Sequence, residues 1–275
     1  MPLIPVKPRF TPHTDLKDRV NAQSPAQPMP LVHVTEMGYA RDILLSGQLM
    51  TRRCDVFERE LLYFFLGRPA YRLKDEVSPM RQISRYPCVF VVDPARIAPV
   101  HVYPFDTGAL ASGRYSDADP HLAVEDYKLE ASHEAALKQL AYAFDTPDDY
   151  FEGRLRPNLQ DGVPAFHQST LSYLRIANQA NRGINNSAAY DDRASAIEVA
   201  TDQHLDLKSA VELAILPKQF LEGDAGQQNS ELLARLQTLG INTDLYDWQS
   251  TRSPADYRAE INGKVFAHVK ARPIP

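Results

Sequence analysis

The chain has 275 residues and a formal net charge of −5, with 44% hydrophobic and 24% charged residues. This length can bury a substantial hydrophobic core, and no apolar run approaches the roughly 20 residues that span a bilayer, which argues against a membrane protein. The two cysteines, Cys54 and Cys88, lie in no CxxC or Cys/His pattern, and the N-terminus lacks the pattern of a secretory signal. The sequence therefore predicts a cytoplasmic protein without a disulfide framework or a metal site.

Positive charge gathers in one segment of this acidic chain. Between Thr51 and Arg85 there are eight Lys or Arg residues against five acids, a local excess of three, whereas Asp117–Glu152 is rich in acids. If a polyanion such as nucleic acid binds, we expect it near the first segment and not the second.

Residues 1–30 hold seven of the 21 prolines and little periodic apolar pattern, which predicts an extended or loosely attached arm that either wraps the domain or is mobile. Residues 31–275 then predict a single domain. Within it, residues 101–170 follow a looser pattern, with a polar loop and an amphipathic helix that ends before Pro147, and we interpret them as an insertion or lid.

The first elements of the domain place polar side chains next to a short helix. Leu31–Thr35 predicts a strand with His33 and Thr35 on one face, and the helix that follows ends at Gly47. The alternative for His33 is a core histidine with satisfied hydrogen bonds. Further along, Pro87–Pro94 is a continuous apolar run that predicts a central buried strand.

An aromatic strand over Leu61–Arg72 breaks at Gly67 and presents Arg68 at the break. An arginine between a glycine and a proline is well placed to grip a pair of phosphates. The alternative is a surface arginine at a strand end.

The run Arg193–Thr201 predicts a strand that carries a carboxylate. Alternation puts Ile197 and Val199 on one face and Glu198 between small alanines on the other, which leaves open volume beside the acid. Such an acid suits ligand contact; the alternative is an edge strand with its glutamate in water.

The remaining pattern alternates helices and strands and predicts an α+β fold. It contains no P-loop and no GxGxxG motif. The further elements that we expect are helices over 166–178 and 230–239, the latter stopped by Gly240, a strand over 210–217, and a possible terminal strand over 265–269.

Three of these segments resemble, in order, the motifs of DarT-type ADP-ribosyltransferases, toxins that modify DNA bases with NAD. His33-Val34-Thr35 with the helix ending at Gly47 resembles the opening HxT motif. Tyr63–Tyr71 (YFFLGRPAY) resembles the aromatic strand that ends in an arginine, and Arg193–Val199 (RASAIEV) is similar to the strand that bears the catalytic glutamate.

The resemblance implies an ADP-ribosyltransferase-like split sheet, mixed or antiparallel, with flanking helices and a helical insertion. It implies that Glu198 drives transfer and that Arg68 contacts NAD phosphate or positions the acceptor, which makes these two the predicted catalytic residues. The predicted cofactor-binding residues are His33, Thr35, Gly47, Leu49, Tyr63, Arg68 and Tyr71. The predicted substrate-recognition residues are Arg72, Asn185, Asn186 and Arg193.

The implied function is transfer of ADP-ribose from NAD, as co-substrate, to a base of single-stranded DNA or RNA by a toxin or anti-phage defence effector. An antitoxin protein is then a candidate partner. The alternatives are a protein acceptor, an NAD glycohydrolase, and a non-catalytic binding module on the same fold.

Overall fold

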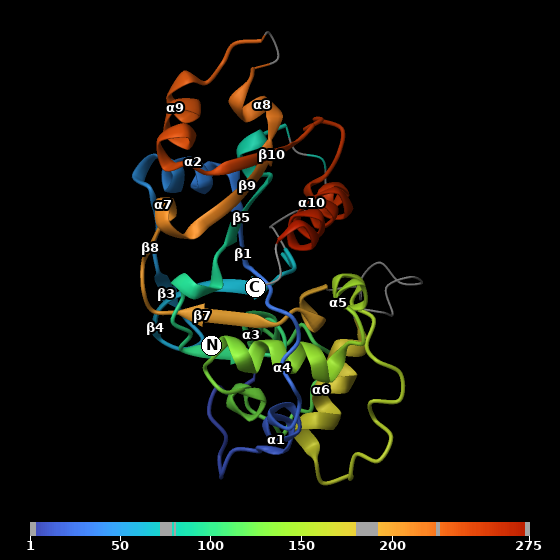
Figure 1. Ribbon diagram of the computed structural model, residues 1–275. Helices are drawn as coiled ribbons and strands as arrows, with labels where there is room; N and C mark the ends of the chain where they lie inside the picture. The colour runs from blue at the N-terminus through green and yellow to red at the C-terminus, as the bar shows by residue number, and fades with distance from the viewer. Residues whose placement is uncertain (1–3, 72–78, 80, 180–191, 224–225, 273–275) are drawn as a thin grey trace. The chain divides into compact units, whose positions relative to one another are not determined.

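The computed structural model describes residues 4–71, 79, 81–179, 192–223 and 226–272 (Figure 1). The chain forms two compact units: unit 1 comprises residues 1–28, 52–66 and 98–202, and unit 2 comprises residues 29–51, 67–97 and 203–275. This differs from the single domain predicted over 31–275. Each unit draws on three separate stretches, so no linker in the sequence marks a boundary. Both units combine strands with helices, and the fold class is α+β as predicted.

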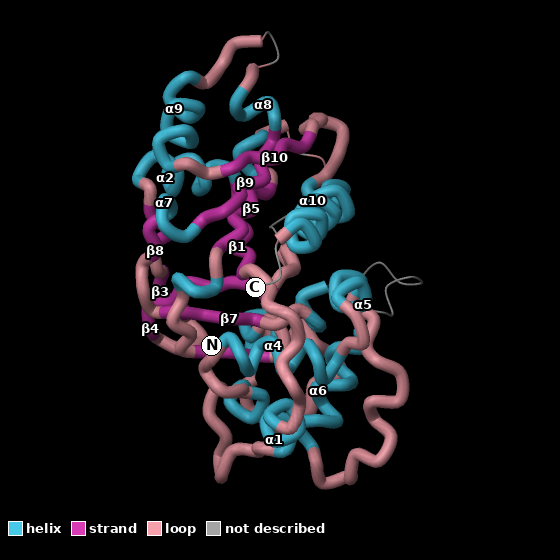
Figure 2. The backbone as a smooth tube through the Cα atoms, in the orientation of Figure 1, coloured by secondary structure: helices cyan, strands magenta, loops and turns pink. Residues whose placement is uncertain are grey.

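The sheet of unit 1 contains the strand that carries Glu198. Its strands are β3 (Arg52–Cys54), β4 (Arg59–Leu66), β6 (His101–Tyr103) and β7 (Glu198–Thr201). Strand β4 pairs with β3 along its first half and with β7 along its second (Figure 2). Strand β7 also pairs with β6. All three pairings are antiparallel, so β7 lies between two neighbours.

The register of these strands sorts their side chains by face. Phe65 and Tyr103 lie opposite Glu198, and Tyr63 and His101 lie opposite Ala200. Directly opposed residues point to the same side of a sheet, so these aromatic and polar residues share a face with Glu198. The other face is mainly apolar and carries Leu62, Phe64, Val102, Val199 and Thr201.

The segment over 101–170, interpreted from the sequence as an insertion or lid, belongs to unit 1. It supplies β6, which pairs with β7, and its helix α4 (His133–Ala143) ends before Pro147 as predicted. The other helices of this unit are α3 (Thr107–Ala111), α5 (Pro147–Glu152), α6 (Gln168–Gln179) and the 3-10 helices η3 (Val124–Tyr127) and η5 (Asp192–Ser195).

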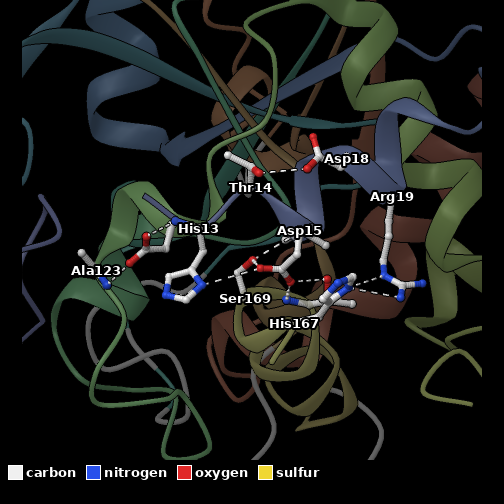
Figure 3. A network of polar contacts seen from close by, with 11 residues as sticks. His13, Thr14, Asp15, Asp18, Arg19, Ala123, His167 and Ser169 are labelled. Atoms are coloured by element: carbon white, nitrogen blue, oxygen red, sulfur yellow. Dashed lines mark hydrogen bonds and ion pairs between the residues drawn. The ribbon is translucent and has the colours of Figure 1, made fainter. Parts of the chain in front are cut away.

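The proline-rich N-terminal segment, predicted as an arm over 1–30, contains a helix that packs against the rest of unit 1. Its helix α1 (Asp15–Asn21) buries Leu16 and Val20 and contacts α4 and α6 (Figure 1). The Asp15 carboxylate accepts hydrogen bonds from the backbone N–H of Thr170 at 2.8 Å and from the hydroxyls of Thr170 and Ser169 (Figure 3). Two apolar residues one turn apart, and an acid that accepts hydrogen bonds from the first turn of α6, therefore hold α1 in place.

Unit 2 contains a mixed sheet in the order β10, β9, β5, β1. Its strands are β1 (Leu31–Glu36), β5 (Pro87–Val92), β9 (Val211–Pro217) and β10 (Asn242–Tyr246). The pairs β1–β5 and β5–β9 are antiparallel, and β9–β10 is parallel. All six residues of β5 are buried between two neighbours, which confirms the predicted central strand.

The C-terminal strand predicted over 265–269 is wrong. These residues belong to α10 (Arg258–Ala271), where Ile261 and Val265 are buried at helical spacing. A second, two-stranded pairing joins β2 (Gln48–Leu49) to β8 (Leu205–Asp206). The remaining helices of unit 2 are α2 (Met37–Ser46), α7 (Leu207–Ala210), α8 (Lys218–Leu221), α9 (Ser230–Leu239), η1 (Ile83–Arg85), η2 (Pro94–Arg96) and η6 (Pro254–Tyr257).

None of the helices in the described ranges combines the length and the apolar character that crossing a membrane requires.

Two ten-residue helices of unit 2 end on a glycine in the left-handed region. Gly47 ends α2 with φ 80°, and Gly240 ends α9 with φ 70°, as the sequence predicted for both. The Arg235 side chain of α9 donates from Nε to the carbonyl of Leu44, 3.0 Å away in the last turn of α2. A Cβ at Gly47 would lie 2.5 Å from Nη2 of Arg235, whereas a Cβ at Gly240 would meet no atom within 4 Å.

This difference predicts unequal costs for the same substitution. Gly240→Ala should lower the free energy of unfolding by about 1 kcal/mol, the cost of left-handed backbone. Gly47→Ala should lower it by about 1 kcal/mol more, because Arg235 must move and lose its hydrogen bond. Urea denaturation of both variants measures this; equal losses would show that the Arg235 contact contributes nothing.

Candidate active site

Glu198 is the first residue of β7, and its side chain is only 4% exposed. It lies on a strand flanked on both sides, so the alternative of an edge strand with its glutamate in water is wrong. The strand is shorter than predicted, because residues Asp192–Ser195 form the 3-10 turn η5. A buried carboxylate requires hydrogen-bond donors, and the neighbouring residues supply them.

Thr107, the first residue of α3, holds both oxygens of the Glu198 carboxylate. Its hydroxyl donates to Oε1 at 2.7 Å, and its backbone N–H donates to Oε2 at 3.1 Å. Two donors from one residue fix the plane of the carboxylate and leave lone pairs on each oxygen for a further partner.

A second carboxylate lies next to this pair. Asp106 caps α3 by accepting from the backbone N–H of Ala109 at 2.8 Å, and its other oxygen accepts from Nη1 of Arg193 at 2.7 Å. The side chains of Asp106 and Arg193 are 14% and 12% exposed. Arg193, predicted for substrate recognition, therefore lies in the Glu198 cluster with its guanidinium engaged by Asp106.

The pKa of Glu198 is raised to about 8, first by burial and then by the negative charge of Asp106. The hydrogen bonds from Thr107 and the charge of Arg193 oppose this shift. At neutral pH the carboxyl is therefore largely protonated, and a positive charge placed beside it would favour its ionised form.

Tyr63, predicted to bind cofactor, lies on the same sheet face as Glu198. Its hydroxyl donates to Sγ of Cys54 at 2.9 Å. Burial, and then the charge of Glu198, raise the pKa of Tyr63 above its ordinary value, so the phenol stays protonated. It can stack against a ligand or accept a hydrogen bond from one without carrying charge.

Tyr150 of α5 aligns the two strands at the site. Its buried hydroxyl donates to the carbonyl of Leu66 at 2.7 Å and accepts from the backbone N–H of Ile197 at 3.2 Å. The N–H of Leu66 also donates to the carbonyl of Ile197, 2.9 Å away. The end of β4 and the residue before Glu198 are thereby held by one side chain from an element remote in sequence.

Several of the other predicted site residues belong to unit 2. His33 and Thr35 lie half-buried on one face of β1, and Leu49 is buried opposite Leu205. Gly47 has the structural role described above, as a left-handed cap beside Arg235.

Arg68 and Tyr71 also belong to unit 2. Arg68 follows Gly67, which has φ 59°, and is only 1% exposed, so the surface arginine considered as an alternative is wrong. Tyr71 is buried, and its hydroxyl donates to the carbonyl of Pro254 at 3.2 Å.

The predicted site residues Arg72, Asn185 and Asn186 lie outside the described residues. Unit 1 brings together Glu198, Tyr63 and Arg193; the binding roles predicted for the residues of unit 2 stay predictions.

Sequence reasoning did not find the partners of Glu198. Asp106-Thr107-Gly108 lay within a segment interpreted as a loop, although an aspartate before a short helix is a common N-cap. The β-rich triplet His101-Val102-Tyr103 was a further signal for a strand. Nothing local in the sequence indicates that Thr107 contacts a residue 91 positions away.

Among the described residues, no group of three or more His, Cys, Asp or Glu side chains is placed to hold a metal ion. Comparison of the chain with family models, curated proteins and solved structures finds no match.

The raised pKa of Glu198 predicts how stability depends on pH. The ordinary value is 4.5 and the folded value is about 8, so the folded chain holds the proton more tightly. Its contribution to stability is present below pH 4.5 and is lost as pH rises through 8. As pH rises between these values, the free energy of unfolding of the unsubstituted protein should fall relative to that of the Glu198→Gln variant. The upper limit of this fall is about 1.4 kcal/mol per pH unit.

Urea denaturation from pH 5 to 8 measures this difference. The matched control is Glu134→Gln, at an α4 glutamate whose side chain is 64% exposed. A pH profile of Glu198→Gln that runs parallel to the unsubstituted protein would contradict the assignment.

Proposed function

We propose that this protein is an NAD-dependent ADP-ribosyltransferase that acts on a base of single-stranded nucleic acid. The observation that carries the proposal is the buried Glu198 carboxyl, oriented by Thr107 on a sheet face that it shares with Tyr63. This arrangement supports the role that the motif resemblance implies for Glu198. A toxin or defence role remains an expectation from the resemblance.

The proposed chemistry needs a negative charge at one place. Breaking the bond between nicotinamide and C1′ of the ribose leaves the electron pair on neutral nicotinamide and builds positive charge on the ribose. An ionised carboxylate beside the ribose stabilises that charge in the transition state. A lone pair of the acceptor forms the new bond to C1′, and the proton that the acceptor loses passes to Glu198 or to water.

The surroundings of Glu198 suit this task. Thr107 orients the carboxylate without neutralising it, because a hydroxyl and a backbone N–H carry no formal charge. The pyridinium ring of NAD brings a positive charge that favours the ionised form of Glu198.

A nucleic-acid acceptor is what the motif resemblance implies, and the β3–β4 hairpin offers arginines that could contact phosphates. Arg52 and Arg53 are exposed on β3, in the same unit as Glu198, although the exposed acids Asp55, Glu58 and Glu60 of the hairpin balance its arginines and Arg59 pairs with Asp202. Cationic side chains of this kind attract the phosphate backbone. A base that reaches a nearly buried carboxyl must be unstacked, so single strands are the expected substrate.

The direct test is transfer of label from radiolabelled NAD. Glu198→Gln should abolish it, since the amide keeps the shape and loses the charge; Glu134→Gln should retain the full rate. Retained transfer in Glu198→Gln, with a folded chain, would overturn the proposal.

The destination of the label separates the alternatives. Incubation with pools of single-stranded DNA, RNA and lysate protein should place the label on nucleic acid. Label on protein, or only as free ADP-ribose, would identify a protein-modifying enzyme or a glycohydrolase instead. Thermal protection by NAD without any turnover would identify a binding module.

The pH dependence of transfer should follow the ionisation of Glu198. We expect kcat/KM to rise with pH and to level off near 8, the pKa of Glu198 in the free chain. Asp106→Asn removes the neighbouring charge that raises this pKa, and should move the profile to lower pH. Asp206→Asn is the matched control, because Asp206 also caps a helix, accepting from the N–H of Ser209 at 3.0 Å. If the pH profile of kcat/KM is the same in Asp106→Asn as in the unsubstituted protein, the ionisation of Glu198 does not determine that profile.

A further inference from the structure

An aromatic ring covers two residues of β6 next to Glu198. Phe57 stacks on His101 with ring centroids 4.6 Å apart and an interplanar angle of 17°, and on Tyr103 at 5.8 Å and 28°. His101 and Tyr103 are on the face that carries Glu198, since Tyr103 lies directly opposite it across the strand pair. The three rings therefore border the candidate active site.

The covered rings hold polar atoms that core packing does not explain. His101 is 8% exposed and Tyr103 is fully buried, yet both ring nitrogens of His101 and the hydroxyl of Tyr103 make no hydrogen bond within the described residues. Burying such groups without partners costs free energy, and phenylalanine at either position would fill similar space without that cost. These atoms are available to a ligand that replaces the ring above them.

The protonation of these groups describes the ligand. Burial, and then the charges of Lys128 and Arg59, lower the pKa of His101 to about 4, with Asp202 opposing the shift. Burial, and then the charge of Glu198, raise the pKa of Tyr103 above its ordinary value. At neutral pH the pair is uncharged and presents both donors and acceptors beside flat apolar surfaces. That combination matches a neutral heteroaromatic ring such as a nucleobase.

Phe57 lies at the tip of the β3–β4 hairpin, in the four-residue turn Asp55–Glu58. Glu58 has φ 52°, a left-handed conformation that a glutamate adopts at a cost. Aromatic side chains on which bases stack are typical of sites for single-stranded nucleic acid.

We infer that Phe57 occupies the position that the acceptor base takes when it binds. A nucleobase of a single strand displaces the Phe57 ring, stacks on His101 and Tyr103, and forms hydrogen bonds with their polar atoms. This inference rests on the proposed function and extends it by naming the residues that bind the acceptor. The displaced hairpin tip leaves the base beside Glu198, on the face where transfer takes place.

The test measures binding of a fluorescein-labelled single-stranded DNA oligonucleotide by fluorescence anisotropy, without NAD. His101→Phe and Tyr103→Phe keep the rings and remove the polar atoms, and each should weaken binding about tenfold, the effect of one lost hydrogen bond. Tyr142→Phe is the matched control and should bind unchanged, because the Tyr142 hydroxyl is also buried without a partner in the described structure, but on α4.

Phe57→Ala tests the displacement itself. It should bind the oligonucleotide as tightly as the unsubstituted protein or more tightly, because no ring has to leave. Weaker binding by Phe57→Ala, or unchanged binding by both His101→Phe and Tyr103→Phe, would overturn the inference. Urea denaturation of each variant confirms that the fold is retained.

Release of nicotinamide from NAD, measured without nucleic acid, separates this inference from the proposed function. If nicotinamide is released but the oligonucleotide does not bind, or binds the β6 variants equally, the acceptor site is wrong and the NAD chemistry stands. The release assay is then repeated with the oligonucleotide present. If the oligonucleotide binds as expected but neither assay releases nicotinamide, the transferase proposal fails and the base-binding site stands.

Discussion

A carboxyl group removed from water depends on the donors around it, and the geometry near Glu198 follows from that requirement. Thr107 can reach both oxygens because α3 begins four residues after Tyr103, the partner of Glu198 in the sheet. Asp106 caps the helix and also binds Arg193. This ion pair joins the segment that follows β6 to the segment that precedes β7. Tyr150 then fixes the residue that precedes Glu198. The contacts come from three parts of the chain, around residues 106, 150 and 193, and together they fix the position of Glu198.

The sequence predicted the elements of this fold better than their pairing. A continuous apolar run located β5, a period-3.6 pattern located α9, and the glycines at 47 and 240 predicted both helix ends, because these signals are local. The role of Tyr103 beside Glu198 is a contact between distant segments, and no local pattern contains it. The same limit explains why the sequence predicts a strand over 265–269 where the structure has a helix: a short apolar run fits either period until its neighbours are known.

The protonation of Glu198 gives the proposed reaction an order of events. In the free chain, burial and Asp106 favour the neutral carboxyl, which avoids two adjacent negative charges. A bound cation would reverse this preference, so binding of NAD and loss of a proton become linked equilibria. The carboxylate would then acquire its charge only when the substrate that needs it is present. Neutral His101 and Tyr103 fit the same scheme, because they add no competing charge on the acceptor side.

The way the chain threads its two units has a consequence for its synthesis. Unit 1 begins near the N-terminus but lacks β7 until residue 202 has emerged, and unit 2 needs β10 and α10 at the C-terminal end. Domains fold during translation as their residues leave the ribosome, so neither unit can be completed early. Nascent chains carry β4 and β6 for a long stretch of synthesis before β7, the strand that joins them, arrives. A chain that terminates before residue 198 lacks both this strand and the carboxylate on which the proposed reaction depends.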